Sequence, residues 1–252
     1  MKKLLFLAII AFAITSCDGI GGSADSGSDY GQGGSMARFA ITGDYLYTVD
    51  NETLKMFDIS DPKKPYYMKD KDQYLNFGLE TIFPMDTLLF LGSQTGMYIY
   101  NIKRPAFPEQ LAVVSHITSC DPVVSDGRYA YVTLNSESVW CGRSVNQLNV
   151  YDLTNIRKPV EIASLDNFKC PKGLGLYGNR LYICDGGLKV YDVTSPANPV
   201  WIDDSSYITE LTDAYDVIPL GGGILLLTGS KGIYEIDITG DKISLISKIL
   251  VK

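Results

Sequence analysis

Hydrophobic and polar residues alternate along most of the chain in short runs, and one longer pattern returns five times. Its best-formed copy is LKVYDVTSPANP, from Leu188 to Pro199, and the other copies begin at Leu54, Met97, Leu148 and Ile233. The first residues of the copies lie 43, 51, 40 and 45 positions apart, a period typical of propeller blades. The pattern therefore predicts a repeat fold in which each copy belongs to one structural unit.

Each copy predicts a β-strand that is buried on both faces. From Leu188 to Val193, apolar residues fall on both sides of a period-two strand, as expected for a small sheet packed between two others. The strand ends with an aspartate in four copies and with Asn101 in the other; the aspartates are Asp58, Asp152, Asp192 and Asp237. Acids that recur at one position also suit a metal or acid ring, but we expect them to accept hydrogen bonds from turn amides.

Further strands precede each copy. Runs rich in aromatic and branched residues begin at Tyr45, Leu88, Tyr129, Arg180 and Ile224. Dipeptides that suit tight hairpins, such as Gly178-Asn179, come before most of them, and another short apolar run comes before each turn. With the stretch after the prolines this makes four strands per repeat. We predict an all-β fold, a closed β-propeller of five four-stranded blades that begins near residue 37, in which the first and last blades meet mainly by face packing.

The segment GLGLYGNRLYICDGGLKVYDVTSPANP, from Gly173, carries a resemblance to a known family. A hairpin followed by a strand of this form resembles the LVIVD-repeat family of bacterial lipoproteins, and the resemblance extends over roughly residues 38 to 252. The last copy departs from the pattern because it lacks both prolines. The resemblance implies a β-propeller and implies no settled activity.

The first 36 residues predict the cellular location of the protein and no folded structure. Lys2 and Lys3 precede an apolar run that ends in ITSC, which is typical of a secretory signal peptide over residues 1–16. The ending resembles a bacterial lipobox, which implies that Cys17 becomes the lipidated N-terminus. Residues 17–36 then form a flexible tether rich in Gly and Ser, and residues 37–252 form the propeller. We expect a protein anchored by lipid to a bacterial membrane, in the periplasm or at the cell surface.

The net charge of the protein limits the classes of partner that it can be expected to bind. Removing the signal peptide leaves 20 basic and 29 acidic residues, a net charge of about −9. Nucleic acids are bound largely through Lys and Arg, so we expect no nucleic-acid partner. Adhesion to anionic lipid head groups is disfavoured for the same reason.

Four cysteines remain after Cys17, and an even number in an oxidising compartment predicts disulfides. Three pairings are open. Their places in the hairpins favour Cys120 with Cys141 and Cys170 with Cys184, although a two-residue turn at Gly178-Asn179 would set Cys184 opposite Gly173. The spacings lack a CxxC signature, so we expect no metal site and no cofactor.

Residues that occur only once against the repeat are the candidates for chemistry. His116 is the only histidine, and the chain contains no GxSxG motif. A Ser or Cys nucleophile needs a base within hydrogen-bond reach, and nothing marks a partner for His116. We therefore interpret His116 as a structural or surface residue and name no catalytic residue.

The clearest departure from the repeat is a long connection in the third unit, from Asn135 to Gln147. Long loops often carry binding function. This one places four binding candidates beside Cys141: Trp140, Arg143, Asn146 and Gln147. An indole with amides and an arginine suits a sugar ring or a peptide, and the alternative is a loop that is pinned by a disulfide and has no partner.

An acidic group lies between the fourth and fifth copies, at Asp203, Asp204, Glu210, Asp213 and Asp216. Calcium takes several oxygen ligands, but no EF-hand spacing is present. We interpret the group as a solvated acidic loop.

These observations favour a binding or scaffold module for a protein or glycan. The alternative is a propeller enzyme, such as a lactonase-like hydrolase or a sugar lyase, with acidic residues or a divalent metal near the central channel. Such an enzyme needs converging acids, bases or metal ligands, and the sequence shows no matched set.

Overall fold

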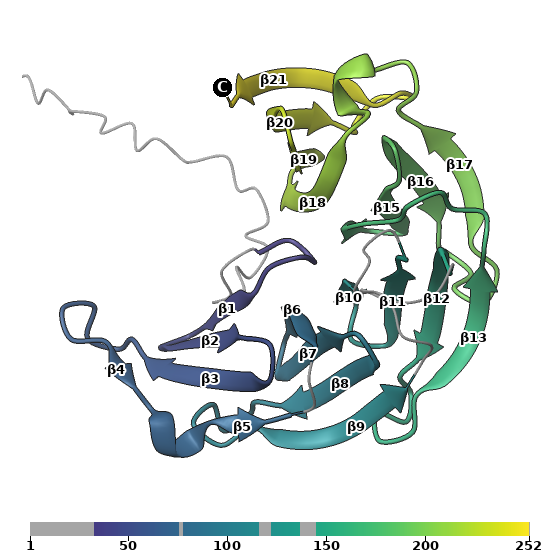
Figure 1. Ribbon diagram of the computed structural model, residues 1–252. Coiled ribbons are helices and arrows are strands. Elements are labelled where there is room, and N and C mark those ends of the chain that lie inside the picture. Colours follow the sequence, from purple (N-terminus) through teal and green to yellow (C-terminus); the bar gives the residue numbers. More distant parts are fainter. Residues whose placement is uncertain (1–32, 76–77, 116–121, 137–144, 252) are drawn as a thin grey trace, which may run out of the picture.

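The computed structural model describes residues 33–75, 78–115, 122–136 and 145–251. Five antiparallel sheets are arranged around a central axis, each with its first strand innermost (Figure 1). The protein is therefore an all-β propeller of five blades, as the repeat predicts. The long strand pattern of each repeat forms the third strand of a blade, and the aromatic run before it forms the second.

The first three blades contain thirteen strands and one 3-10 helix. Blade 1 contains β1 (Phe39–Thr42), β2 (Tyr45–Val49), β3 (Thr53–Asp58), β4 (Tyr66–Tyr67), η1 (Lys69–Lys71) and β5 (Gln73–Tyr74). Blade 2 contains β6 (Leu79–Met85), β7 (Leu88–Ser93), β8 (Gly96–Asn101) and β9 (Glu109–Ser115). Blade 3 contains β10 (Val123–Ser125), β11 (Tyr129–Leu134), β12 (Gln147–Asp152) and β13 (Val160–Leu165). In blade 1 both β4 and β5 pair with β3, so the outer strand is split in two.

The last two blades have four strands each. Blade 4 contains β14 (Leu174–Tyr177), β15 (Arg180–Cys184), β16 (Leu188–Asp192) and β17 (Val200–Asp204). Blade 5 contains η2 (Thr209–Leu211), β18 (Ala214–Gly221), β19 (Ile224–Gly229), β20 (Gly232–Asp237) and β21 (Ser244–Leu250). The pairing of the third with the fourth strand shifts register in blades 2 to 5, and such bulges increase the local twist.

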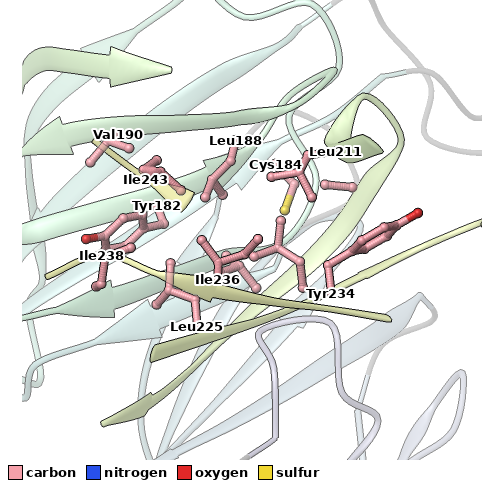
Figure 2. Close-up of a cluster of buried hydrophobic side chains, with 13 residues drawn as sticks. Tyr182, Cys184, Leu188, Val190, Leu211, Leu225, Tyr234, Ile236, Ile238 and Ile243 are labelled. Carbon is pink, nitrogen blue, oxygen red and sulfur yellow. The ribbon is translucent and has the colours of Figure 1, made fainter. Parts of the chain in front are cut away.

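Four buried hydrophobic clusters hold the blades together, one at each junction from blade 1 to blade 5. The junction of blades 4 and 5 is shown in Figure 2, where Leu188 and Cys184 of blade 4 lie beside Leu225 and Ile236 of blade 5. Burying apolar area in this way is the main favourable term in folding. Blades 2 to 4 each pack against a neighbouring blade on both faces, which explains why the repeat is apolar on both sides.

The face packing expected between the first and last blades is absent from the described residues, since none of these clusters joins blade 5 to blade 1. The contact is made instead by the segment before β1, Gly33–Met36, which we call the strap. Ser35 and Met36 both donate hydrogen bonds to Asp216 at the start of β18. Residues assigned to the tether therefore belong partly to the propeller.

The capping role of the recurring acids is confirmed. Asp58, Asp152, Asp192 and Asp237 each accept a hydrogen bond from the backbone N–H two residues on, at 2.7–2.9 Å, and Asn101 does the same. At each aspartate the pKa is lowered, first by a hydrogen bond from the Ser or Thr hydroxyl two residues on and then by this backbone hydrogen bond. The acids hold turns on the outside of the ring and do not converge.

The helices that the structure describes are two single turns, η1 and η2. Neither is long and apolar enough to cross a membrane.

Candidate binding site in the central channel

The inner strands of four blades and the strap enclose a cavity of about 460 Å³ around the central axis. β6, β10, β14 and β18 each contribute residues to its wall, and the strap contributes Gly33, Gly34 and Ser35. β1, the inner strand of blade 1, contributes no residue to the wall, and the strap takes its place. The volume is within the range of about 300–1,000 Å³ that is usual for small-molecule sites.

The wall of the cavity is mainly apolar. Its apolar side chains come from all four inner strands: Phe83, Pro84, Met85, Val124, Leu174, Leu176, Val217, Ile218 and Pro219. Two aspartates, Asp86 and Asp126, stand on hairpin turns at one rim. The channel therefore offers van der Waals contact along its length and negative charge at one end.

Ser125 and Asp126 of the wall are already engaged in holding the protein's own backbone. Ser125 donates to the carbonyl of Tyr129 at 2.7 Å. Asp126 accepts from the N–H groups of Arg128 and Tyr129 at 2.8 and 2.6 Å. A general acid or base needs to reach a substrate proton, and these groups serve the hairpin turn instead.

Asp216 is the buried carboxylate behind the channel wall, with 8% of its surface exposed. It accepts hydrogen bonds from Ser35 Oγ (3.0 Å), the Met36 N–H (3.1 Å) and the Val217 N–H (3.0 Å). Ser35 Oγ in turn accepts from the Leu174 N–H at 2.8 Å. Burial raises the pKa of Asp216 to about 6, against the lowering effect of these hydrogen bonds.

Two glycines make room for this carboxylate. A Cβ at Gly34 would overlap Asp216 Oδ2, and a Cβ at Gly173 would overlap Oδ1. Positions 34 and 173 must therefore lack a side chain for three segments to meet at Asp216: the strap, the entry to β14 and the start of β18. This contact joins residues about 180 positions apart in the sequence.

The predicted loop site is only partly described. Trp140 and Arg143 lie outside the described residues. Asn146 accepts from the Ser136 N–H at 3.2 Å and donates to the Lys169 carbonyl, and Gln147 donates to Ser164 Oγ at 3.1 Å. Asn146 and Gln147 therefore have hydrogen-bond partners within the protein.

The segment beside that loop is held by a buried ion pair that the sequence did not reveal. Asp185 accepts from the Lys169 N–H (3.0 Å) and the Cys170 N–H (2.6 Å) through Oδ1. Its Oδ2 lies 2.7 Å from Lys189 Nζ, and its side chain has no exposed surface. Asp185 thus orients the chain that enters blade 4.

The structure does not join Cys170 to Cys184, so this half of the disulfide prediction is wrong. Cys184 lies opposite Gly173, with a hydrogen bond from its N–H to the Gly173 carbonyl at 2.9 Å. Its thiol is buried in the junction of blades 4 and 5, and burial followed by the charge of Asp216 raises its pKa well above the usual value. Cys120 and Cys141 lie outside the described residues, as do Cys17 and His116.

The acidic group between blades 4 and 5 does not form a single solvated loop. Asp216 is buried, Asp213 accepts from Ser230 and from the Lys231 N–H, and Glu210 pairs with Lys248 at 3.2 Å. Asp203 accepts from Tyr207 Oη at 3.4 Å. Within the described residues no three His, Cys, Asp or Glu side chains are grouped so as to hold a metal ion.

Comparisons with known proteins agree with this architecture. The LVIVD repeat model matches residues 33–71 and 172–206. No curated protein matches the sequence. The first matched segment includes the strap and most of blade 1, and the second contains all of blade 4.

Several solved structures are similar to this chain. A protein from Lactobacillus plantarum is 14% identical with a TM-score of 0.62, and the match covers 81% of this chain and 67% of that one. A periplasmic gluconolactonase from Pseudomonas aeruginosa is 15% identical with a TM-score of 0.62, covering 83% and 68%. AztD from Citrobacter koseri is 12% identical with a TM-score of 0.57, covering 86% and 61%. At these identities the likeness shows the fold alone, and the protein is accordingly a five-bladed β-propeller that carries LVIVD repeats.

Proposed function

We propose that this chain is a lipid-anchored extracytoplasmic protein whose propeller binds a partner and does not catalyse a reaction. Cys17 carries the lipid, residues 18–32 form the tether, and the strap fixes the tether to the propeller beside the central channel. The channel receives an apolar group of the ligand. The loop from Asn135 to Gln147, with Trp140 and Arg143, contacts the rest of a protein or glycan.

The observation that carries this proposal is the chemistry of the channel wall. Nine apolar side chains line the cavity, whereas Ser35, Ser125 and Asp126 are engaged in hydrogen bonds that hold the strap and a turn. Apolar clefts of this kind bind ligands by burying surface. Catalysis needs polar groups aimed at a reacting atom.

Binding in the channel can be tested with an anilinonaphthalene sulfonate dye, whose fluorescence rises in an apolar site. We expect saturable binding to the wild type and a loss of at least tenfold in affinity for Met85→Trp, because the indole fills the cavity. Val113→Trp adds the same side chain to an exposed position of β9 and should leave dye binding unchanged. Equal affinity for all three proteins would contradict a channel site.

The anchor has its own test. Labelling with a fatty-acid analogue should mark the wild type and not Cys17→Ser, and the variant should move from the membrane fraction to the soluble fraction. Unchanged membrane partitioning of Cys17→Ser would show that the proposed address is wrong.

The loop can be tested with a glycan array. Trp140→Ala should lose the signals that the wild type gives, with an unchanged melting temperature, because Trp140 is proposed to stack on the sugar. Wild-type signals that survive in Trp140→Ala would remove this loop from the proposal.

The enzymatic alternative is tested with gluconolactone, the substrate class named for one structure of similar fold. We expect no hydrolysis above the uncatalysed rate, with or without added calcium or magnesium. A rate that depends on the protein and is abolished by a chelator would favour a metal-dependent enzyme over a binding module.

A further inference from the structure

A second cavity, of about 320 Å³, lies between blades 4 and 5, away from the central channel. It is lined by residues of β15, β16 and β17 and by the turn that links β20 to β21: Arg180, Tyr182, Val190, Ile202, Asp203, Ile238, Gly240, Asp241, Lys242 and Ile243. Figure 2 shows Tyr182 at one side of this junction, beside Val190, Ile238 and Ile243. The lining of the cavity thus combines five apolar or aromatic side chains with four charged ones, two of each sign.

The hydroxyl of Tyr182 has no hydrogen-bond acceptor in the structure. Only 1% of the residue is exposed, and the oxygen itself exposes less than 1 Å². Burying a hydroxyl without a partner costs about 1–3 kcal/mol, so native proteins rarely leave one unpaired.

The repeat shows what Tyr182 lacks. Tyr47 is its equivalent in blade 1, because Tyr47 pairs with Met56 as Tyr182 pairs with Val190, each two residues before the capping aspartate. Tyr47 donates to the carbonyl of Pro105, in the turn of the next blade, at 2.9 Å. Asp241 occupies the position of Pro105 in the last repeat.

The turn of the last blade is built differently from the other four. The turns of blades 1 to 4 close with the same backbone hydrogen bond: Lys64 to Asp61, Phe107 to Arg104, Lys158 to Asn155 and Asn198 to Ser195. The equivalent bond, from Ile243 to Gly240, is absent although both residues are described. Loss of both prolines thus accompanies an open turn, a missing acceptor and a cavity.

The positively charged residues of the lining indicate which group could satisfy Tyr182. Burial raises the pKa of Tyr182, and the Arg180 guanidinium lowers it, first as a hydrogen-bond donor toward the phenol oxygen and then through its positive charge. A guanidinium has no acceptor to offer, so the phenol proton is not satisfied by Arg180. Lys242 Nζ lies 5.5 Å from the centre of the Tyr207 ring. Of the two carboxylates, Asp203 already accepts from Tyr207, and Asp241 is exposed on the turn.

We propose that this cavity binds a small carboxylic acid with an apolar body. The carboxylate accepts hydrogen bonds from Tyr182 Oη and Arg180, with Lys242 adding positive charge. The apolar body packs on Val190 and Ile238. Because the phenol oxygen is covered, the exposed Arg180 side chain shifts as the ligand enters.

The test uses naphthalene carboxylate as the probe and backbone amide signals in heteronuclear NMR as the readout. Gly240 reports on this cavity and Gly175 on the central channel. We expect saturable shifts at Gly240, with affinity lowered about tenfold or more by Tyr182→Phe and by Arg180→Gln, because each removes a charge-assisted hydrogen bond. Tyr47→Phe is the matched control and should leave the affinity unchanged.

The uncharged naphthalene carboxamide should bind more weakly than the carboxylate at Gly240. Shifts at Gly175 alone would assign the probe to the channel and overturn the proposal. Equal affinity of the wild type and Tyr182→Phe at Gly240 would overturn it as well, and Tyr182→Phe should fold normally because it loses only an unpaired hydroxyl.

Discussion

The junction of blades 1 and 2 and the junction of blades 4 and 5 are built from the same repeat, and they differ in the turn that faces a buried tyrosine. Both bury an apolar cluster and both place a tyrosine at the same point of the second strand. At the first junction Tyr47 donates to the Pro105 carbonyl, and at the second Tyr182 has no acceptor. A repeat thus keeps its fold through its strands, while a change confined to a turn can create a candidate ligand site.

The largest expected effects test whether the two junctions are equally well packed. Leu54→Ala at the first junction and Leu225→Ala at the second should each cost about 2–5 kcal/mol of unfolding free energy, because both side chains are fully buried. Denaturant unfolding measures both. A far smaller loss for Leu225→Ala would mean that the whole second junction is loose and that the difference extends beyond the turn.

The strap should give the second largest effect, and it depends on pH. The folded pKa of Asp216, about 6, is higher than its ordinary value of 3.8, so the folded protein binds the proton more tightly than the unfolded chain. Lowering the pH from about 7 to about 4 should therefore stabilise the wild type relative to Asp216→Asn, by at most about 3 kcal/mol.

Thermal unfolding of the wild type and Asp216→Asn across that pH range measures this difference. Parallel pH profiles for the two proteins would show that the Asp216 carboxyl titrates normally, and that the strap contact does not depend on a buried charge.

The capping aspartates should give smaller effects that are alike at intact and altered turns. Asp192→Ala and Asp237→Ala each remove the exposed hydrogen bonds that cap a turn and should lower the melting temperature slightly. Because both folded pKa values are lowered, the contribution is present above the ordinary value of 3.8 and is lost as the pH falls below it. A clearly larger loss for Asp192→Ala would mean that the last repeat no longer needs its cap.

The blades and their caps could be predicted because they repeat. Five copies of one pattern specify five blades, and an aspartate at a fixed position specifies a capped turn. The strap could not be predicted in this way, because a Gly- and Ser-rich segment has no periodicity and its partner, Asp216, lies about 180 residues away. For the same reason the sequence predicts a solvated Asp216, whereas the structure buries it.

The candidate sites show the same limit. The channel wall consists of ordinary strand residues, which form a cavity only when four inner strands meet around an axis. The difference at Tyr182 is visible in the sequence, since aligning the repeats places Tyr182 with Tyr47 and places Asp241 with Pro105. Its consequence can be recognised only when the tyrosine of one blade is known to contact the turn of the next blade.

The most direct measurement compares the unfolding free energies of Tyr47→Phe and Tyr182→Phe without any ligand. Tyr47→Phe should lose about 0.5–1.5 kcal/mol, and more if the Pro105 carbonyl is left unpaired, because it removes a buried hydrogen bond. Tyr182→Phe should lose nothing or gain stability, because it removes a buried hydroxyl that has no partner. Equal losses for the two variants would show that Tyr182 is already satisfied and would contradict the difference between the two junctions.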